Sequence, residues 1–346
     1  MSINGWPGGV ILKTRITPTG RFVDSAASGV WSLSDATSYT GQGLWPSSAN
    51  PSPRGLFAGG VGQTTAISYI TISTTGNATS FGTLTEARGY LAACSSSTRG
   101  VWAGGDIGGN VRTATIDYVT IATTGSATSF GSLYQSNLNI SGLSNSTRGV
   151  FCGGNNTTAL MQYITIATTG GSTNFGNLVR AYGSFTGTTA STTRGLICSG
   201  PGEAAENVID YITIATTGNA TSFAELTLNR WKVSACSSST RAVFVGGESS
   251  GTGGLHGPYQ NVMDYVTIAS AGNAADFGDL TLQVKLTASC SSPTRGVVGY
   301  GLTESARQVT MVYFTIATTG NATSFGDFPQ PGREGRAACS SAHGGI

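Results

Sequence analysis

Short runs of alternating apolar and polar residues fill the chain, and their length favours β-strands over helices. Residues 116–122 show the pattern: alternation sends Tyr118 and Thr120 to one face of a strand, and Val119 and Ile121 to the other. Turns rich in Gly, Ser, Thr and Asn separate the runs. We therefore expect an all-β protein of many short strands and tight turns.

One pattern of strands recurs along the chain, and its clearest mark is a tyrosine followed by a phenylalanine twelve residues later. The pairs are Tyr69/Phe81, Tyr118/Phe130, Tyr163/Phe175, Tyr211/Phe223, Tyr265/Phe277 and Tyr313/Phe325. The period of about 45 to 54 residues is typical of four-stranded blades. One blade cannot cover both faces of its own sheet, so six copies predict a six-bladed β-propeller in which these tyrosines are buried.

The two ends of the repeat region complement each other. In the second repeat, residues 89–95 form a predicted first strand, and residues 97–100 the turn to a second strand. The first repeat begins at its second strand, at residues 54–60, whereas the chain finishes with residues 336–342, which match a first strand. We expect this C-terminal strand to complete the first blade and close the ring, which removes both exposed sheet edges.

The order of motifs in each repeat resembles the kelch repeat. A second strand ends in Gly-Gly, the third strand carries the tyrosine and the fourth an aromatic residue, and an arginine such as Arg88, Arg180 or Arg230 precedes the next first strand. The likeness covers residues 54–346, but Phe81 and its equivalents stand where kelch repeats usually have tryptophan. The amino-acid sequence of residues 93–100 and 211–223 is similar to kelch-like repeats in structural proteins of tailed bacteriophages.

Residues 1–53 lie outside the repeat and predict a small N-terminal extension. Two snippets, Gly-Val-Trp-Ser-Leu-Ser-Asp around Trp31 and Gly-Leu-Trp-Pro around Trp45, resemble a segment common in phage tail and fibre proteins. The resemblance implies that Trp31 and Trp45 help dock the protein to other tail or capsid proteins. Residues 46–53 are rich in Pro and Ser and are typical of a linker.

Composition excludes several classes of partner. Charged residues make up 10% of the chain and the net charge is +2, so no basic surface for nucleic acid is expected. No stretch of about 20 apolar residues occurs, so no membrane insertion is expected. The chain begins without a visible secretory signal. The six cysteines recur at equivalent positions of different repeats, too far apart to pair, and we expect buried free thiols made in a reducing cytoplasm.

Residues able to support catalysis are few. Asp117, Asp210 and Asp264 share one position of the repeat, which favours a structural role such as binding a loop amide. His256 and His343 have no second histidine or cysteine at metal-ligand spacing, so neither a metal nor a cofactor is expected. The turn arginines recur in the same way, and we expect them to satisfy turn or neighbouring-blade carbonyls. They are Arg99, Arg148, Arg194, Arg241 and Arg295.

Sequence variation between repeats is concentrated in the second loop of each blade, whereas the first and third turns barely change. Variable loops on a rigid scaffold are where recognition is usually built. The candidate binding residues are therefore Asp106, Glu203, Glu248, His256 and Tyr259. The longest loop spans residues 248–261, and we expect its replacement by a short Gly-Ser turn to leave the fold intact.

These observations predict a non-enzymatic virion protein that is tail or fibre associated and displays a propeller for host-surface recognition or protein–protein contacts. A host-surface glycan or protein is the expected external partner. A capsid decoration protein is one alternative. A propeller enzyme that degrades host polysaccharide is another, and would require paired carboxylates on the variable loops, with Glu203, Glu206 and Glu248 as the acids to test. An intracellular kelch-type adaptor is a third.

Overall fold

The computed structural model describes residues 34–35, 52–155, 158–182, 186–198, 207–250 and 256–346. Contacts divide the chain into two units, residues 1–52 and 53–346. In the first unit the described residues are Ser34, Asp35 and Ser52, so the predicted docking residues Trp31 and Trp45 lie outside the described part. Among the described residues, no helix is long and apolar enough to cross a membrane.

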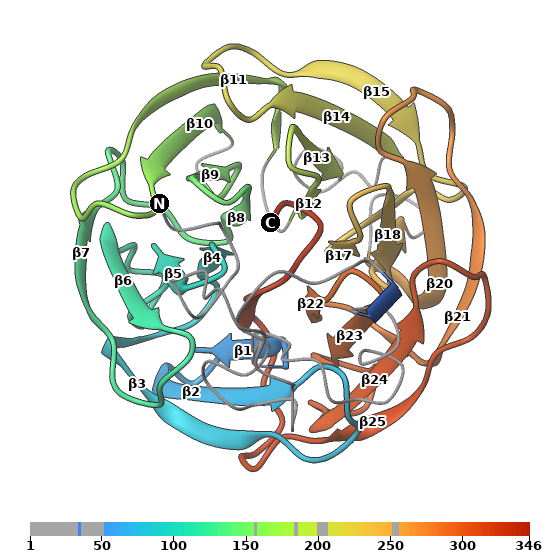
Figure 1. Ribbon diagram of the computed structural model, residues 1–346, viewed down its shortest axis with the longest axis horizontal. Helices are drawn as coiled ribbons and strands as arrows, with labels where there is room; N and C mark the ends of the chain where they lie inside the picture. The colour runs from blue at the N-terminus through green and yellow to red at the C-terminus, as the bar shows by residue number, and fades with distance from the viewer. Residues whose placement is uncertain (1–33, 36–51, 156–157, 183–185, 199–206, 251–255) are drawn as a thin grey trace. The chain divides into compact units, whose positions relative to one another are not determined.

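The second unit is a six-bladed β-propeller, which confirms the predicted fold (Figure 1). Each blade is an antiparallel sheet, and in blades 2, 3, 4 and 6 the strands follow one another in chain order from the axis outwards. The innermost strands contact each other in a closed circle around the axis, because each packs against the innermost strand of the next blade. These six strands, from the first blade to the sixth, are β26, β4, β8, β12, β17 and β22.

The first three blades each contain four strands. Blade 1 consists of β26 (Ala337–Ser340), β1 (Arg54–Ala58), β2 (Thr64–Thr71) and β3 (Thr79–Arg88). Blade 2 consists of β4 (Ala92–Ser95), β5 (Arg99–Ala103), β6 (Thr115–Thr120) and β7 (Thr128–Ser132). Blade 3 consists of β8 (Ser141–Ser144), β9 (Arg148–Cys152), β10 (Thr158–Thr165) and β11 (Thr173–Tyr182).

Blade 5 departs from the pattern, and its two neighbours do not. Blade 4 consists of β12 (Gly187–Ala190), β13 (Arg194–Cys198), β14 (Val208–Thr213) and β15 (Thr221–Glu225). Blade 5 consists of β17 (Ser234–Ser237), β18 (Arg241–Val245), β20 (His256–Thr267) and β21 (Ala275–Val284), extended by β16 (Arg230–Trp231) and β19 (Glu248–Ser250). Blade 6 consists of β22 (Ala288–Ser291), β23 (Arg295–Gly299), β24 (Thr310–Thr315) and β25 (Thr323–Asp327).

The C-terminal strand closes the ring as the sequence predicts. β26 pairs antiparallel with β1, with Cys339 opposite Leu56 and Ala337 opposite Ala58. The innermost strand of blade 1 therefore comes from the end of the chain, and its other three strands come from the beginning of the repeat region. This pairing covers the edge of β1 that would otherwise be exposed.

Hydrophobic cores lie between the blades. Six clusters of buried side chains occur, and each combines residues of two adjacent blades. The cluster between blades 1 and 2, for example, packs Leu56 and Phe81 against Trp102 and Val119. Both faces of every sheet are covered in this way, and burial of each large apolar side chain stabilises the ring by about 1.5 to 3 kcal/mol. All six cysteines are buried free thiols, as predicted.

The repeated arginine and tyrosine stack on each other at the joints between blades. In blade 2 the guanidinium of Arg99 lies 4.6 Å from the centre of the Tyr118 ring, and Tyr118 meets Phe130 edge to face. The same Arg99 donates hydrogen bonds of 3.0 and 2.8 Å to the carbonyls of Ile166 and Ala167 in blade 3. The predicted structural role of the arginines is therefore confirmed. The predicted burial of the tyrosines is wrong in degree, because the tyrosine rings are half-buried under the arginines.

Candidate functional site

The two ends of the propeller differ in character. The first and third turns of each blade lie at one end, which we call the turn face. The second loops and the links between blades lie at the other end, the loop face, where they pair with each other: Gly89 bridges Asp106, and Lys285 bridges Leu302. Sequence variation between the blades is therefore gathered at one end of the axis, around the start of the innermost strands.

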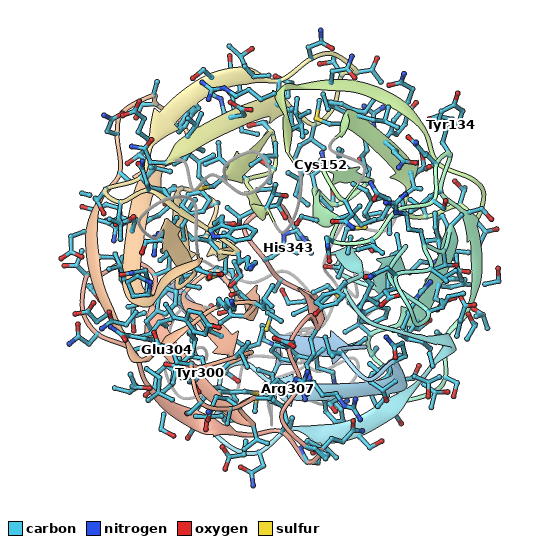
Figure 2. All side chains as sticks on the ribbon, turned by 180° about the vertical axis from the view of Figure 1, so that it is seen from behind. Tyr134, Cys152, Tyr300, Glu304, Arg307 and His343 are labelled. Atoms are coloured by element: carbon cyan, nitrogen blue, oxygen red, sulfur yellow. The ribbon has the colours of Figure 1, made fainter. Side chains whose placement is uncertain are left out.

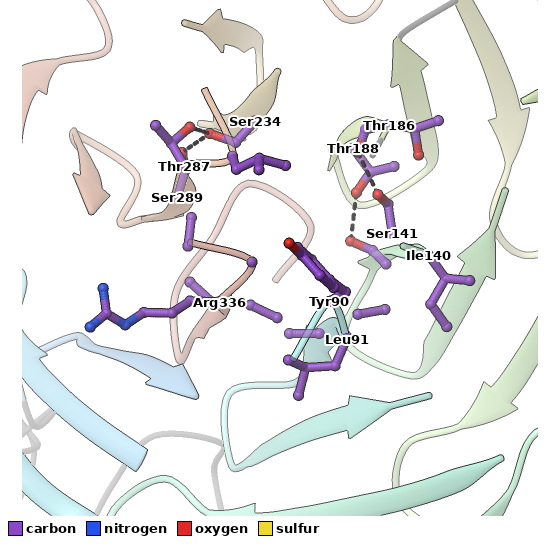
Figure 3. Close-up of a pocket in the computed structure, with 18 of the residues that line it drawn as sticks. Tyr90, Leu91, Ile140, Ser141, Thr186, Thr188, Ser234, Thr287, Ser289 and Arg336 are labelled. Atoms are coloured by element: carbon purple, nitrogen blue, oxygen red, sulfur yellow. Dashed lines mark hydrogen bonds between the residues drawn. The ribbon is translucent and has the colours of Figure 1, made fainter. Parts of the chain in front are cut away.

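A cavity of about 110 Å³ opens at the loop face on the axis of the ring (Figure 3). The innermost strands and the residues just before them line this axial pocket, and most of the side chains are small or carry hydroxyl groups. A second cavity of about 60 Å³ continues along the axis. Residues that line both cavities are Ala93, Gly142, Thr188, Ala235, Ser289 and Ala338.

Hydroxyl groups of neighbouring blades meet around the axial pocket. The Ser234 hydroxyl lies 2.6 Å from the hydroxyls of both Thr287 and Ser289 (Figure 3). On the opposite side, Ser141 donates to the carbonyl of Thr186 and Thr188 donates to the carbonyl of Gly142. Because a hydroxyl both donates and accepts hydrogen bonds, this lining is suited to a ligand that carries hydroxyl groups of its own.

The axial channel is occupied near the turn face by the C-terminal residues. Nε2 of His343 lies 3.2 Å from both the Ser144 hydroxyl and the Ser95 carbonyl, and the ring stands at the centre of the propeller (Figure 2). The amide of Gly345 donates to Nδ1, so the neutral ring carries its proton on Nε2. Removal from water lowers the pKa of His343 to about 4. The channel is therefore open to a ligand from the loop face.

Unusual backbone conformations surround the mouth of the axial pocket. The residue two positions before the innermost strand has a positive φ in five blades: Tyr90, Asn139, Lys232, Leu286 and Gly335, with φ between 55° and 67°. The equivalent residue of blade 4 lies outside the described residues. Glycine adopts this conformation freely, whereas larger residues pay about 1 kcal/mol or more for it. Tyr90, Lys232 and Leu286 therefore place large side chains at the mouth of the pocket in a backbone conformation that costs less for glycine.

Two lysines enclose Glu248 at the loop face of blades 5 and 6. Its carboxylate is fully buried and accepts hydrogen bonds of 2.9 Å from both Lys232 and Lys285. Lys285 also lies over the ring of Tyr259, 4.2 Å from its centre. Burial alone would raise the pKa of Glu248, but the hydrogen bonds from Lys285 and Lys232 outweigh it and hold the pKa below its usual value. The carboxylate is therefore a buried counter-ion rather than a proton donor at neutral pH.

This cluster corrects one prediction made from the sequence. Replacement of residues 248–261 by a short turn was expected to leave the fold intact because the loop would lie outside the sheet. In fact β19 pairs with both β16 and β20, and Glu248 neutralises two lysines whose side chains are 10% exposed. Removal of the whole segment would leave two largely buried ammonium groups without their carboxylate, which is costly.

The remaining predicted binding residues lie in different places. Tyr259 pairs in register with Glu248 and is half-buried, so these two candidates are brought together. Asp106 belongs to blade 2, and its carboxylate accepts hydrogen bonds from the Gly108 amide of its own loop and from the Gln63 side chain of blade 1. His256 begins β20, opposite Ser250, but its side chain is not among those described. Glu203 and Glu206 lie outside the described residues.

The repeated aspartates serve the joints between blades, as predicted for Asp117 and Asp264. Asp117 accepts hydrogen bonds from the Thr85 amide at 3.3 Å and from the guanidinium of Arg88 at 2.7 Å. Asp264 binds the Thr227 amide and Arg230 in the same way. Burial lowers the pKa of both arginines, against the opposing effect of the aspartates. Asp210 is likewise fully buried. Among the described residues, no group of three or more His, Cys, Asp or Glu could hold a metal ion.

Sequence reasoning did not single out the residues at the mouth of the axial pocket. Tyr90, Lys232 and Leu286 belong to the links between blades, which were predicted only as connections. A signal was nevertheless present, because the position four residues before Cys94 and its equivalents holds a different residue type in each blade. Only the closed ring shows that this position faces the axis.

Comparison with known proteins identified no related family or protein. No protein-family model matches the chain, and no curated protein matches it significantly in sequence.

Proposed function

We propose that the chain is a non-enzymatic virion protein of a tailed bacteriophage that presents the loop face of its propeller to a host surface or to another protein. The observation that carries the proposal is the concentration of the axial pocket, the variable loops and the strained mouth residues on this one face. The turn face consists instead of nearly identical turns. The likeness of the repeats and of the N-terminal snippets to phage proteins supports assignment to the tail or a fibre.

An exposed apolar pair on the loop face supports a role in contacts. Ile107 and Val111 lie in the second loop of blade 2 with 38% and 53% of their surface exposed. The two residues are neighbours, and apolar side chains exposed together can mark an interaction site. A hydrolytic alternative is less well supported, because Glu248 is a buried counter-ion and the Asp117 carboxylate is bound by Arg88.

The presence of the protein in the particle tests the first half of the proposal. Immunogold labelling and mass spectrometry of purified virions should find the chain at the tail or a fibre. Its absence from purified particles would refute a virion role, and labelling confined to the capsid would favour the capsid decoration alternative.

Matched substitutions on the two faces test the second half. Val111→Arg places a charge on the loop face, and Thr124→Arg places the same charge in an exposed third turn on the turn face. Val111→Arg should lower attachment to host cells at least tenfold, whereas Thr124→Arg should not change it. The opposite result would show that recognition uses the turn face.

A further inference from the structure

The charged side chains that border the axial pocket are already bound to other groups of the protein. Lys232 and Arg336 are the charged residues among those that line it. The Lys232 ammonium binds Glu248 at 2.9 Å and lies over the Trp231 ring. The Arg336 guanidinium donates to the carbonyls of Arg333 and Pro331 and points away from the pocket (Figure 3). A charged ligand would therefore have to compete with these contacts.

The pocket offers instead hydroxyl groups on its walls and one aromatic ring at its mouth. Ser141, Ser234 and Ser289 come from three different blades and direct hydroxyls to the same cavity. Their present partners are each other, Thr287 and backbone carbonyls, so a ligand hydroxyl can join these networks as donor and acceptor at once. An apolar ligand of the same size could make no hydrogen bonds with these groups.

Tyr90 gives the pocket its aromatic face. It projects from the link between β3 and β4 over the centre of the cavity, and its ring packs against Gly335 (Figure 3). Its φ of 55° is one that glycine adopts without strain, and Gly335 holds the same position in another blade. A strained residue that keeps a large side chain at a cavity mouth points to a use for that side chain. An amphipathic ring of this kind can pack against the apolar face of a sugar.

We propose that the axial pocket binds one uncharged sugar unit of a glycan, with Tyr90 packed against the sugar ring and the serines and threonines of the innermost strands bound to its hydroxyls. The cavity of about 110 Å³ is open at the loop face, so it holds one unit and lets the rest of the glycan leave towards solvent. This inference rests on the proposed function, because it names the kind of host-surface molecule that the loop face recognises.

Binding of free sugars to the full chain tests the inference. The probes are D-glucose, D-galactose, D-mannose, L-rhamnose and N-acetyl-D-glucosamine, with D-glucuronate as the charged counterpart, each observed by saturation-transfer NMR. At least one neutral sugar should receive saturation at its ring protons. No signal from any neutral sugar, or a preference for D-glucuronate, would overturn the inference.

Variants at Tyr90 decide whether the signal comes from this pocket. Tyr90→Asn removes the ring but suits the backbone, since Asn139 adopts the same conformation in blade 3. It should weaken binding at least tenfold, whereas Tyr90→Phe keeps the ring and should stay within about threefold. Tyr134→Asn is the matched control, because Tyr134 is 71% exposed and lies at the rim of the propeller, away from the axis (Figure 2). Equal loss in Tyr90→Asn and Tyr134→Asn, or no loss in either, would refute the pocket.

The two proposals fail in distinguishable ways. If Val111→Arg abolishes attachment to host cells while no neutral sugar binds, the loop face recognises something other than a neutral glycan and the proposed function stands. If a neutral sugar binds through Tyr90 but the protein is absent from virions, the pocket stands and the virion role fails.

Discussion

Single buried charges show how far individual residues depend on their partners in other blades. Glu248 belongs to blade 5, yet one of its two lysines, Lys285, comes from the link into blade 6. The cluster carries two ammonium groups and one carboxylate, all of them removed from most water. Such a group is sensitive to loss of its single negative charge, because each lysine would then face the other without compensation.

Glu248→Gln is therefore expected to lower the free energy of unfolding by about 3 kcal/mol. The neutral amide leaves Lys232 and Lys285 largely buried without a counter-charge. Urea unfolding followed by circular dichroism measures the change. The double variant Glu248→Gln/Lys285→Met should recover part of the loss, because it removes one of the two charges. A single variant as stable as the wild type would show that water reaches the cluster freely.

His343 provides a second residue-scale prediction, on pH. Its folded-state pKa of about 4 lies below the usual 6.5, so the folded protein favours the neutral ring. Its contribution to stability is therefore present above pH 6.5 and is lost as pH falls from 6.5 to about 4, by at most about 3 kcal/mol. Melting temperatures between pH 7 and 4 should fall more steeply for the wild type than for His343→Gln. Parallel curves would contradict a neutral His343 in the folded protein.

The joints between blades share the same backbone hydrogen bonds. The third turn of each blade reaches back to the outermost strand of the blade before it. The turn glycine donates to the carbonyl of the conserved phenylalanine in Gly76–Phe325, Gly125–Phe81, Gly170–Phe130, Gly218–Phe175 and Gly320–Phe277. A second glycine follows the phenylalanine where the two backbones approach closely. Blade 4 has Ala224 at that position. Its joint with blade 5 contains a backbone hydrogen bond from the Ala274 amide to the Glu225 carbonyl.

Gly82→Ala should disturb such a joint. An added Cβ would lie 2.1 Å from the carbonyl oxygen of Gly125, so blades 1 and 2 would have to separate locally. We expect a loss of about 1 to 3 kcal/mol in unfolding free energy, measured by denaturant unfolding. Gly125→Ala, in the turn that faces Gly82, is the control, because its Cβ would meet no atom within 4 Å. Equal effects of the two substitutions would show that the close approach does not limit the joint.

Closure of the ring is a property of the whole molecule. Blade 1 is assembled from both ends of the repeat region, so β26 covers the edge of β1 and also contacts the innermost strands β4 and β22. The last residues of the chain then turn into the axial channel, where Gly344 donates to the carbonyl of Ser237. Two truncations separate these roles.

Deletion of residues 337–346 should cost far more than deletion of residues 342–346. The first removes β26 and exposes the edge of β1 together with half of a blade interface, and the melting temperature should fall by about 10 °C or more. The second leaves β26 in place and should lower the melting temperature by only a few degrees. Differential scanning calorimetry of both variants measures this. Similar effects would mean that the tail in the channel, rather than strand closure, holds the ring together.

The sequence by itself determined the number of blades, the order of the four main strands within a blade and closure by a C-terminal strand, which was predicted at residues 336–342 and lies at residues 337–340. Local pattern carries this information: alternation marks each strand, and repetition of the Tyr–Phe pair and the turn arginine fixes the register. For the candidate site, the sequence predicted only the face of the propeller on which it lies, not the residues that form it. Asp106 and Glu248 occupy equivalent loop positions, yet one binds a backbone amide and a glutamine side chain and the other binds two lysines, and no local pattern distinguishes them.

Tertiary structure alone decided which residues meet around the axis. Tyr90, Ser141, Ser234 and His343 are far apart in the chain and have no common motif. They converge because six blades leave a narrow channel along the axis, which is lined by the innermost strands and by the residues next to them. The sequence therefore specifies the blades six times over, through the repeated motif, whereas the channel and its mouth form only when the ring closes.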